Sequence, residues 1–198
     1  MKLQNVFLAA TLATLMAAGQ LSASVITYTA TLNGPNEAPP NASPGTGFAS
    51  VIFDTTLNTM EVDVVFTGLT AGDTASHIHC CTTLPGTGTA IVATTTPTFT
   101  GFPNAVTSGS YLHTFDMTLS SSYNAAFITA NGGTTTTAEA ALLAGIAAGD
   151  AYLNIHSTNF PSGEIRGFLV LAPEPASLGL VGAALAGLFL TRRRRSQP

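Results

Sequence analysis

Residues 47–67 read Gly-Phe-Ala-Ser-Val-Ile-Phe-Asp-Thr-Thr-Leu-Asn-Thr-Met-Glu-Val-Asp-Val-Val-Phe-Thr. From Met60 onward every second side chain is apolar, and acidic residues stand between them at positions 61 and 63. A period of two is typical of an antiparallel strand that buries one face and exposes the other. We therefore expect a hairpin of two strands, 47–54 and 60–67, joined by a turn at 55–58.

Working outward from this hairpin, the chain repeats the pattern in short segments separated by Gly, Pro and Asn. Two Ala-rich segments break the pattern: we expect helices at 123–130, capped by the serines at 120–122, and at 138–148, capped by Thr137. This arrangement predicts a mainly β domain, an antiparallel β-sandwich or barrel with one or two short helices. The further expected strands are 25–32, 76–81, 89–93, 111–119, 151–157 and 164–171.

The N-terminus has the pattern of a secretory signal peptide. Lys2 gives a positive start, residues 6–18 form an apolar core, and small residues at 21–24 supply a cleavage site. We expect a signal helix within residues 1–23, which is too short to remain as a membrane span. The exported domain then covers residues 24–172, a length that can bury a core of its own.

The C-terminus combines three elements in order: Pro173-Glu174-Pro175, an apolar segment at 176–190, and the cluster Arg192, Arg193, Arg194 and Arg195. As a helix, the apolar segment would be about 22 Å long, shorter than the roughly 30 Å of a bilayer core. That length favours a temporary transmembrane anchor over a permanent one. Arginines at its end would stay on the cytoplasmic side.

This order of elements closely resembles the PEP-CTERM sorting signal of Gram-negative bacteria. The resemblance implies cleavage by an exosortase-type membrane protease and delivery to the cell surface or the extracellular matrix. The alternative is an ordinary single-span anchor.

Charge limits the partners of the exported domain. Without the two terminal segments, one basic residue, Arg166, stands against nine acidic residues, a formal charge of −8 (1 − 9). Such a domain lacks the basic surface that binding to nucleic acid or anionic lipid requires.

Two segments of the domain carry a family pattern. The first is Gly-Leu-Thr at 68–70 followed by Ser-His-Ile-His at 76–79. The second is Ala-Tyr-Leu-Asn-Ile-His-Ser at 151–157 followed by Phe-Pro-Ser-Gly-Glu-Ile-Arg-Gly at 160–167. Together they resemble the CHRD domain, which is named after chordin and also occurs in secreted bacterial proteins. The resemblance covers essentially all of the exported domain and implies an immunoglobulin-like β-barrel with no established enzymatic activity.

Three histidines form a candidate metal site. His77 and His79 are two residues apart on an expected strand, so both rings project from one face, and His156 lies on another expected strand. If these two strands are neighbours, the three imidazoles can converge. The soft sulfur of the cysteines that follow at 80 and 81, beside imidazole, would favour copper or zinc over calcium or magnesium. Residues 68–79 also resemble the copper-binding edge of copper-zinc superoxide dismutases. The alternative is structural, because a histidine ring also bridges loop carbonyls and carboxylates.

Cys80 and Cys81 are adjacent and are the only cysteines of the chain. In an oxidising compartment they could form a vicinal disulfide, remain thiols that serve a metal, or bridge to another chain. Strand alternation sends Cys81 to the face of His77 and His79, and a closed vicinal ring would end the strand at this point.

Arg166 is expected to tie a carboxylate and loop carbonyls together, because its guanidinium offers five donors in a fixed fork. Glu164 shares its strand face and is the expected ion-pair partner, with Asp150 and Asp73 as further candidates. The functional alternative is a clamp for an anionic ligand.

The sequence holds no catalytic constellation: there is no nucleophile elbow, phosphate loop or acid pair at a recognisable spacing. We therefore predict a non-enzymatic protein of the cell surface or extracellular matrix. The competing hypothesis is a copper or zinc protein, with possible redox activity, that uses the three histidines. A third hypothesis is an adhesion module that binds matrix polysaccharide or other surface proteins.

Overall fold

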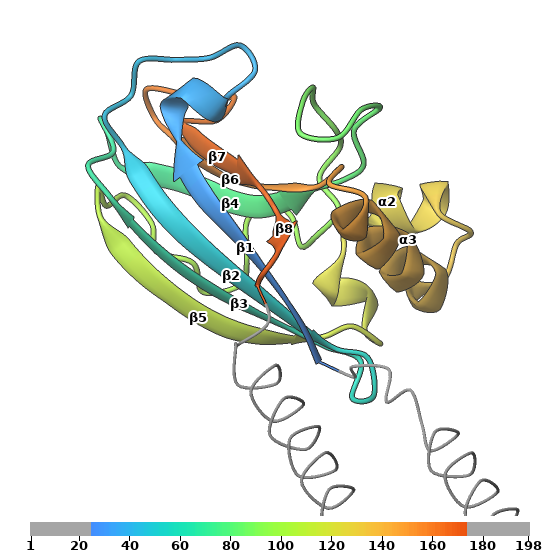
Figure 1. The fold of residues 1–198 in the computed structure, drawn as a ribbon. Coiled ribbons are helices and arrows are strands. Elements are labelled where there is room, and N and C mark those ends of the chain that lie inside the picture. The colour runs from blue at the N-terminus through green and yellow to red at the C-terminus, as the bar shows by residue number, and fades with distance from the viewer. Residues whose placement is uncertain (1–24, 174–198) are drawn as a thin grey trace, which may run out of the picture.

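The computed structural model describes residues 25–173, and within them eight strands form one antiparallel sheet with two short α-helices (Figure 1). The helical elements are η1 (Gly34–Asn36), η2 (Ser120–Ser122), α2 (Ala125–Ala130) and α3 (Thr135–Ala147). The strands are β1 (Val25–Asn33), β2 (Thr46–Asp54), β3 (Thr59–Thr67), β4 (Asp73–His79), β5 (Gly109–Asp116), β6 (Tyr152–Ser157), β7 (Ile165–Phe168) and β8 (Val170–Leu171).

The sheet has the strand order β4-β6-β7-β1-β2-β3-β5, and β8 pairs separately with β1. It curls into a partly closed barrel, so the prediction of a mainly β antiparallel fold with short helices is confirmed. The predicted signal peptide and the apolar segment at 176–190 lie outside the described residues. None of the helices within residues 25–173 is long and apolar enough to cross a membrane.

The central hairpin forms as its alternation predicts. β2 and β3 pair in register from Thr46 with Thr67 to Asp54 with Thr59. The alternating apolar side chains of β3 are buried, namely Met60, Val62, Val64 and Phe66, whereas Val65 on the other face is exposed. The Asp54 carboxylate closes the turn by accepting hydrogen bonds from the backbone N–H groups of Thr56 and Leu57. One face of the hairpin therefore contributes to the core and the other faces outward.

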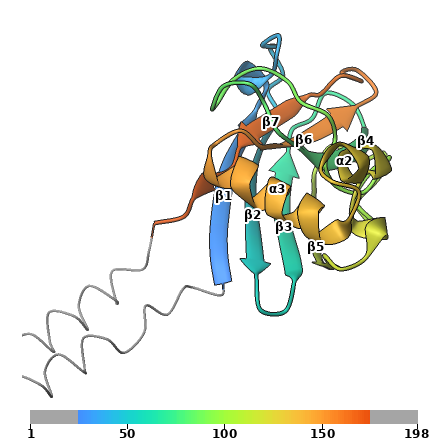
Figure 2. The ribbon, with the colours of Figure 1, turned by 90° about the vertical axis from the view of Figure 1, so that its right-hand side faces the viewer.

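The helices lie together at one side of the curled sheet, and α3 runs across the strand direction (Figure 2). The predicted helices exist, but their caps differ from those expected. Asn124 caps α2 by accepting from the Ala126 N–H, whereas the serines at 120–122 form the separate turn η2. Thr134 rather than Thr137 caps α3, and the two threonines form a reciprocal capping box.

Two predicted strands were wrong in detail. Residues 89–93 contribute only an isolated bridge between Val92 and His79, because this segment lies along the edge of β4 as an irregular loop. The predicted strand 164–171 is divided into β7 and β8. The turn before β7 contains Gly163, whose φ of 131° is a conformation open to glycine.

The two halves of the sheet share one core but differ on their other face. Ile78, Leu153 and Ile165 point into the core shared with the hairpin, so their neighbours in β4, β6 and β7 point to the opposite, outer face. Along β2, β3 and β5 the outer face is largely exposed, whereas along β6 and β7 nearly every residue is buried. The candidate site lies on this covered outer face.

Candidate metal centre

The three candidate histidines lie side by side on neighbouring strands. β4 and β6 pair with His77 opposite Asn154, His79 opposite Tyr152, and Ala75 opposite His156. Because residues directly opposite one another in a sheet point to the same face, all three imidazoles stand on the outer face. The structure thus brings together the three histidines that the sequence placed on two separate strands.

A backbone carbonyl fixes each of the three rings. The Nδ1 atom lies 3.3 Å from the Pro97 carbonyl oxygen in His77, 2.8 Å from that of Ala90 in His79, and 3.0 Å from that of Pro161 in His156. A carbonyl oxygen only accepts hydrogen bonds, so each Nδ1 carries the proton and donates it. In each neutral ring the lone pair therefore sits on Nε2.

These lone pairs converge. The ligand nitrogens of the three rings all lie within 4.8 Å of one another, and Nε2 of His77 is only 2.9 Å from Nε2 of His156. Two unprotonated nitrogens repel at that distance unless a proton or a metal ion lies between them. Nε2 of His79 is buried and has no hydrogen-bond partner among the described residues. The cluster therefore holds three nitrogen atoms that can accept a hydrogen bond or bind a metal ion, and no donor from residues 25–173 lies between them.

The surroundings keep the rings neutral. Burial, with smaller effects from the neighbouring His79 and His156, lowers the pKa of His77 to about 3. Burial likewise lowers the pKa of His79 to about 4 and also lowers that of His156. Metal ions bind the neutral form of imidazole, so the site holds its ligands in the required form.

The donor set fits a borderline transition metal. Nitrogens that bind one zinc ion at about 2.0–2.1 Å in tetrahedral geometry lie about 3.3 Å apart. That value lies between the 2.9 Å that separates Nε2 of His77 and His156 and the 4.8 Å within which all three ligand nitrogens lie. Neutral imidazoles suit zinc and copper better than calcium or magnesium. Carbonyls that accept from the opposite ring nitrogen are the usual outer support of such ligands.

An aromatic and cationic stack borders the cluster. The Tyr152 ring lies parallel to the His79 ring, with ring centres 4.7 Å apart and planes inclined by 7°. The guanidinium carbon of Arg166 also lies over the Tyr152 ring, 4.6 Å from its centre. Tyr152 also accepts a hydrogen bond from the backbone N–H of Ala90, whose carbonyl orients His79.

Arg166 has a different acidic partner from the one expected. Its Nε lies 3.8 Å from a carboxylate oxygen of Glu37 and donates to the Asn36 carbonyl, and its Nη1 donates to the Gly88 carbonyl. Glu164 instead accepts from the Ser43 hydroxyl and the Thr70 N–H. The expected Arg166–Glu164 pair is thus wrong, because shared strand parity does not determine which loop folds over the face.

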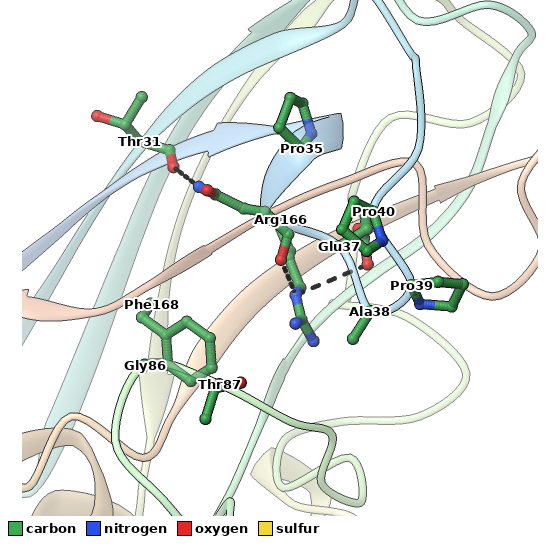
Figure 3. Close-up of a pocket in the computed structure, with 11 residues that line it drawn as sticks. Thr31, Pro35, Glu37, Ala38, Pro39, Pro40, Gly86, Thr87, Arg166 and Phe168 are labelled. Atoms are coloured by element: carbon green, nitrogen blue, oxygen red, sulfur yellow. Dashed lines mark hydrogen bonds and ion pairs between the residues drawn. The ribbon is translucent and has the colours of Figure 1, made fainter.

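Arg166 and Glu37 also lie in a cavity of about 580 Å³ (Figure 3). The turn around η1 forms one wall, with Pro35, Pro39 and Pro40, and the loop at Gly86 and Thr87 faces it. Burial raises the pKa of Glu37 to about 7, and the Arg166 guanidinium lowers it only in part.

The structure joins Cys80 and Cys81 in a disulfide, so neither offers a thiolate to the histidines. β4 ends at His79, directly before the pair. Both sulfur atoms lie against α3, at Gly145, rather than within the histidine cluster.

Sequence reasoning missed Glu37 and the three ring-holding carbonyls. A lone acid in the Pro-rich stretch 35–40 of a charge-poor domain was the available signal for Glu37. The carbonyls of Ala90, Pro97 and Pro161 left no signal, because any residue type supplies a carbonyl.

The fold and the site together define a class of protein, a mainly β domain whose loops cover a polar site on one outer face of a curled sheet. Residues 28–169 match the CHRD domain model, so the chain belongs to the CHRD domain family. Residues 171–195 match the PEP-CTERM protein-sorting motif. The chain is therefore an exported protein that an exosortase-type enzyme processes and that is anchored in the membrane during sorting. Comparison with curated proteins and with solved structures gave no match.

Proposed function

We propose that this chain is a non-enzymatic surface or matrix protein whose CHRD domain binds one copper or zinc ion through His77, His79 and His156. One observation carries the proposal: three carbonyls accept the Nδ1 protons, which leaves the lone pairs on Nε2, and the ligand nitrogens of the three rings lie within 4.8 Å of one another. Three protein ligands leave a fourth position for water or another ligand.

The metal has a structural consequence in this proposal. The site joins β4 and β6 to the loops that carry Ala90, Pro97 and Pro161. A bound ion would hold these segments together and stabilise the covered outer face by its binding free energy. A surface protein gains from such stabilisation without any catalytic step.

Metal content tests this proposal. The protein purified from its native cells, and the metal-free protein after titration with zinc or copper(II), are expected to hold about one ion per chain. His77→Ala/His79→Ala is expected to lose the ion. His113→Ala is the matched control, because His113 lies on β5 outside the cluster. Failure of the wild-type protein to bind either metal, or retention of the ion by the double variant, would overturn the metal site.

The final location at the surface is tested separately. Replacing Pro173, Glu174 and Pro175 by alanine is expected to leave uncleaved protein in the membrane fraction and to remove it from the cell surface. Glu61→Ala serves as the control for a lost acid elsewhere in the chain. Equal surface display of the triple variant and the wild-type protein would contradict the proposed route.

A further inference from the structure

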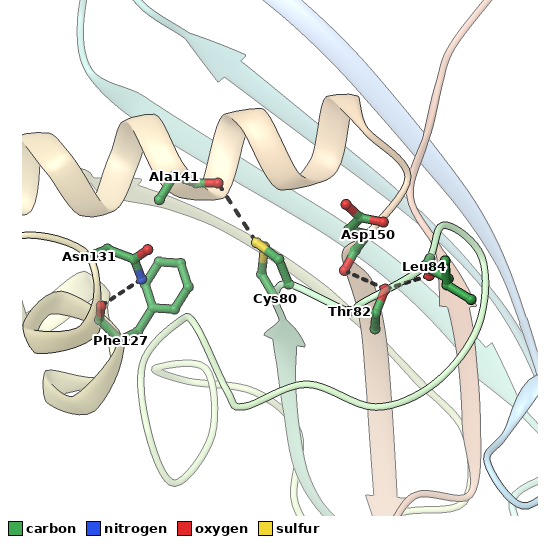
Figure 4. Close-up of a disulfide and its surroundings, with 8 residues drawn as sticks. Cys80, Thr82, Leu84, Phe127, Asn131, Ala141 and Asp150 are labelled. Atoms are coloured by element: carbon green, nitrogen blue, oxygen red, sulfur yellow. Dashed lines mark hydrogen bonds between the residues drawn. A yellow bond between two sulfur atoms is a disulfide. The ribbon is translucent and has the colours of Figure 1, made fainter.

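The Cys80–Cys81 disulfide combines one hidden and one accessible sulfur-bearing residue. Cys80 is 1% exposed, whereas Cys81 lies open to solvent, and its Sγ is 3.8 Å from the Ala141 carbonyl of α3 (Figure 4). Thiol–disulfide exchange requires that a thiolate reach one sulfur. Cys81 is the exposed residue of the pair and so the side from which a thiolate can approach, although both sulfur atoms lie against α3 at Gly145.

A structural staple is a poor explanation of this bond. A disulfide stabilises a fold chiefly by closing a loop of the unfolded chain, and the effect grows with the length of that loop. Cys80 and Cys81 are sequence neighbours, so their bond closes almost no loop. What it does must therefore be local, at the end of β4.

The helix α3 packs directly against both sulfur atoms. A side chain at position 145 would collide with both Sγ atoms, so the backbone of α3 rests directly on the disulfide at Gly145. Two thiol sulfurs, no longer bonded, need about 3.5–4 Å between them, as other non-bonded heavy atoms do. Opening the bond therefore requires that Cys81 turn outward or that α3 shift.

The same short segment holds the disulfide and a candidate metal ligand. The Cys80 N–H donates to the Ile91 carbonyl at 3.1 Å, and the adjacent Ala90 carbonyl accepts from the His79 ring at 2.8 Å. His79 itself forms a bridge with Val92. A displacement of Cys80 would therefore also shift the Ala90 carbonyl, which orients the His79 ring.

We propose that Cys80–Cys81 is a redox-reactive site that small thiols open at Cys81, and that its opening weakens metal binding through His79. The second part rests on the proposed function. The thiolate of one small thiol attacks Cys81 Sγ, the sulfur–sulfur bond breaks, and Cys80 leaves as a thiolate that takes a proton. A second small thiol attacks the mixed disulfide and releases Cys81 as a thiol. The two small thiols are oxidised to their disulfide, and the protein gains two hydrogens.

Reduced glutathione tests the first part. Folded protein incubated with glutathione and then freed of it under nitrogen is expected to gain two hydrogens in mass and to react twice with a thiol reagent. Circular dichroism is expected to stay that of the folded protein. A disulfide that opens only after denaturation would overturn the redox-reactive site.

Zinc affinity tests the second part. We expect the dissociation constant for zinc to rise about 10-fold or more on reduction, the effect typical of losing outer support of a ligand. Cys80→Ser/Cys81→Ser mimics the open pair without reductant and is expected to agree with the reduced wild-type protein. Equal zinc affinity of the oxidised and reduced proteins would overturn the coupling.

A metal-free measurement separates this inference from the proposed function. In apo protein, reduction is expected to increase modification of His79 by diethyl pyrocarbonate, with His113 as the unchanged internal control. If no form of the protein binds zinc, the metal site fails and weakened binding fails with it. An unchanged His79 reactivity would show that the disulfide does not reach the ligand at all.

Discussion

The two halves of the sheet share one hydrophobic core and differ in what covers their outer faces. Along β2, β3 and β5 the outer face is open, and Phe48 and Leu112 are 47% and 67% exposed. Along β4, β6 and β7 the same face carries His77 and Arg166, which are only 6% and 3% exposed. Polar side chains are thus buried and large apolar ones exposed, the reverse of the usual order.

The difference comes from the loops and not from the strands. Asn36 and Gly88 supply carbonyls to Arg166, while Pro97 and Pro161 supply them to His77 and His156. Buried polar groups are tolerated when they are hydrogen-bonded, and loop backbone is the main source of partners here. The covered half therefore depends on polar contacts that the open half does not need.

The largest effect on stability is expected from removing the polar contacts of Arg166 on the covered half. Arg166→Met leaves Glu37 buried without its cation and deprives the Asn36 and Gly88 carbonyls of their donor. Removing one partner of a buried ion pair costs about 3–5 kcal/mol. For a domain of this size we expect the melting temperature to fall by about 10 °C.

The control for this variant is Arg166→Met/Glu37→Gln, which also removes the stranded charge and should recover part of the loss. Thermal unfolding followed by circular dichroism measures both. An unchanged melting temperature of Arg166→Met would mean that the loops cover this face without the ion pair.

The sequence predicted the hairpin and the shared face of His77 and His79 because both follow from alternation within one strand. His156 joins the site only because β4 pairs with β6, and more than seventy residues separate these two strands in the sequence. The metal-site hypothesis therefore had to assume this pairing. The partner of Arg166 was missed for a related reason. Alternation states which side chains share a face, but it contains no information on which loop closes over that face.

Metal binding is expected to give the next largest effect and to act on the covered half alone. At a zinc concentration 100 times the dissociation constant, one site adds about 2.7 kcal/mol of stability. That corresponds to a rise of about 5–10 °C in melting temperature. The rise should vanish in His156→Ala, persist in His113→Ala, and reverse with a chelator. An equal rise in His156→Ala would place the zinc elsewhere.

A smaller effect is expected from the pH dependence of Glu37. Burial raises its pKa from an ordinary value of 4.5 to about 7, so the folded state binds more protons than the unfolded chain between these pH values. Stability contributed by this group therefore falls as pH rises from about 4.5 to 7. We expect the melting temperature to fall as the pH rises through this range. Glu37→Gln should remove that part of the pH profile, and identical profiles would contradict it.

The smallest effect is expected on the open face, where Leu112→Thr introduces a β-branched strand former at an exposed position of β5. Substitutions at such surface sites usually change stability by less than about 0.5 kcal/mol. Val62→Thr, on the core face of the neighbouring strand β3, is the contrast, because it buries a hydroxyl at a cost of about 1–3 kcal/mol. If Leu112→Thr proved as costly as Val62→Thr, the outer face of this half would also be covered in solution. The contrast between the two halves would then reflect two kinds of cover, loops over one half and another molecule over the other.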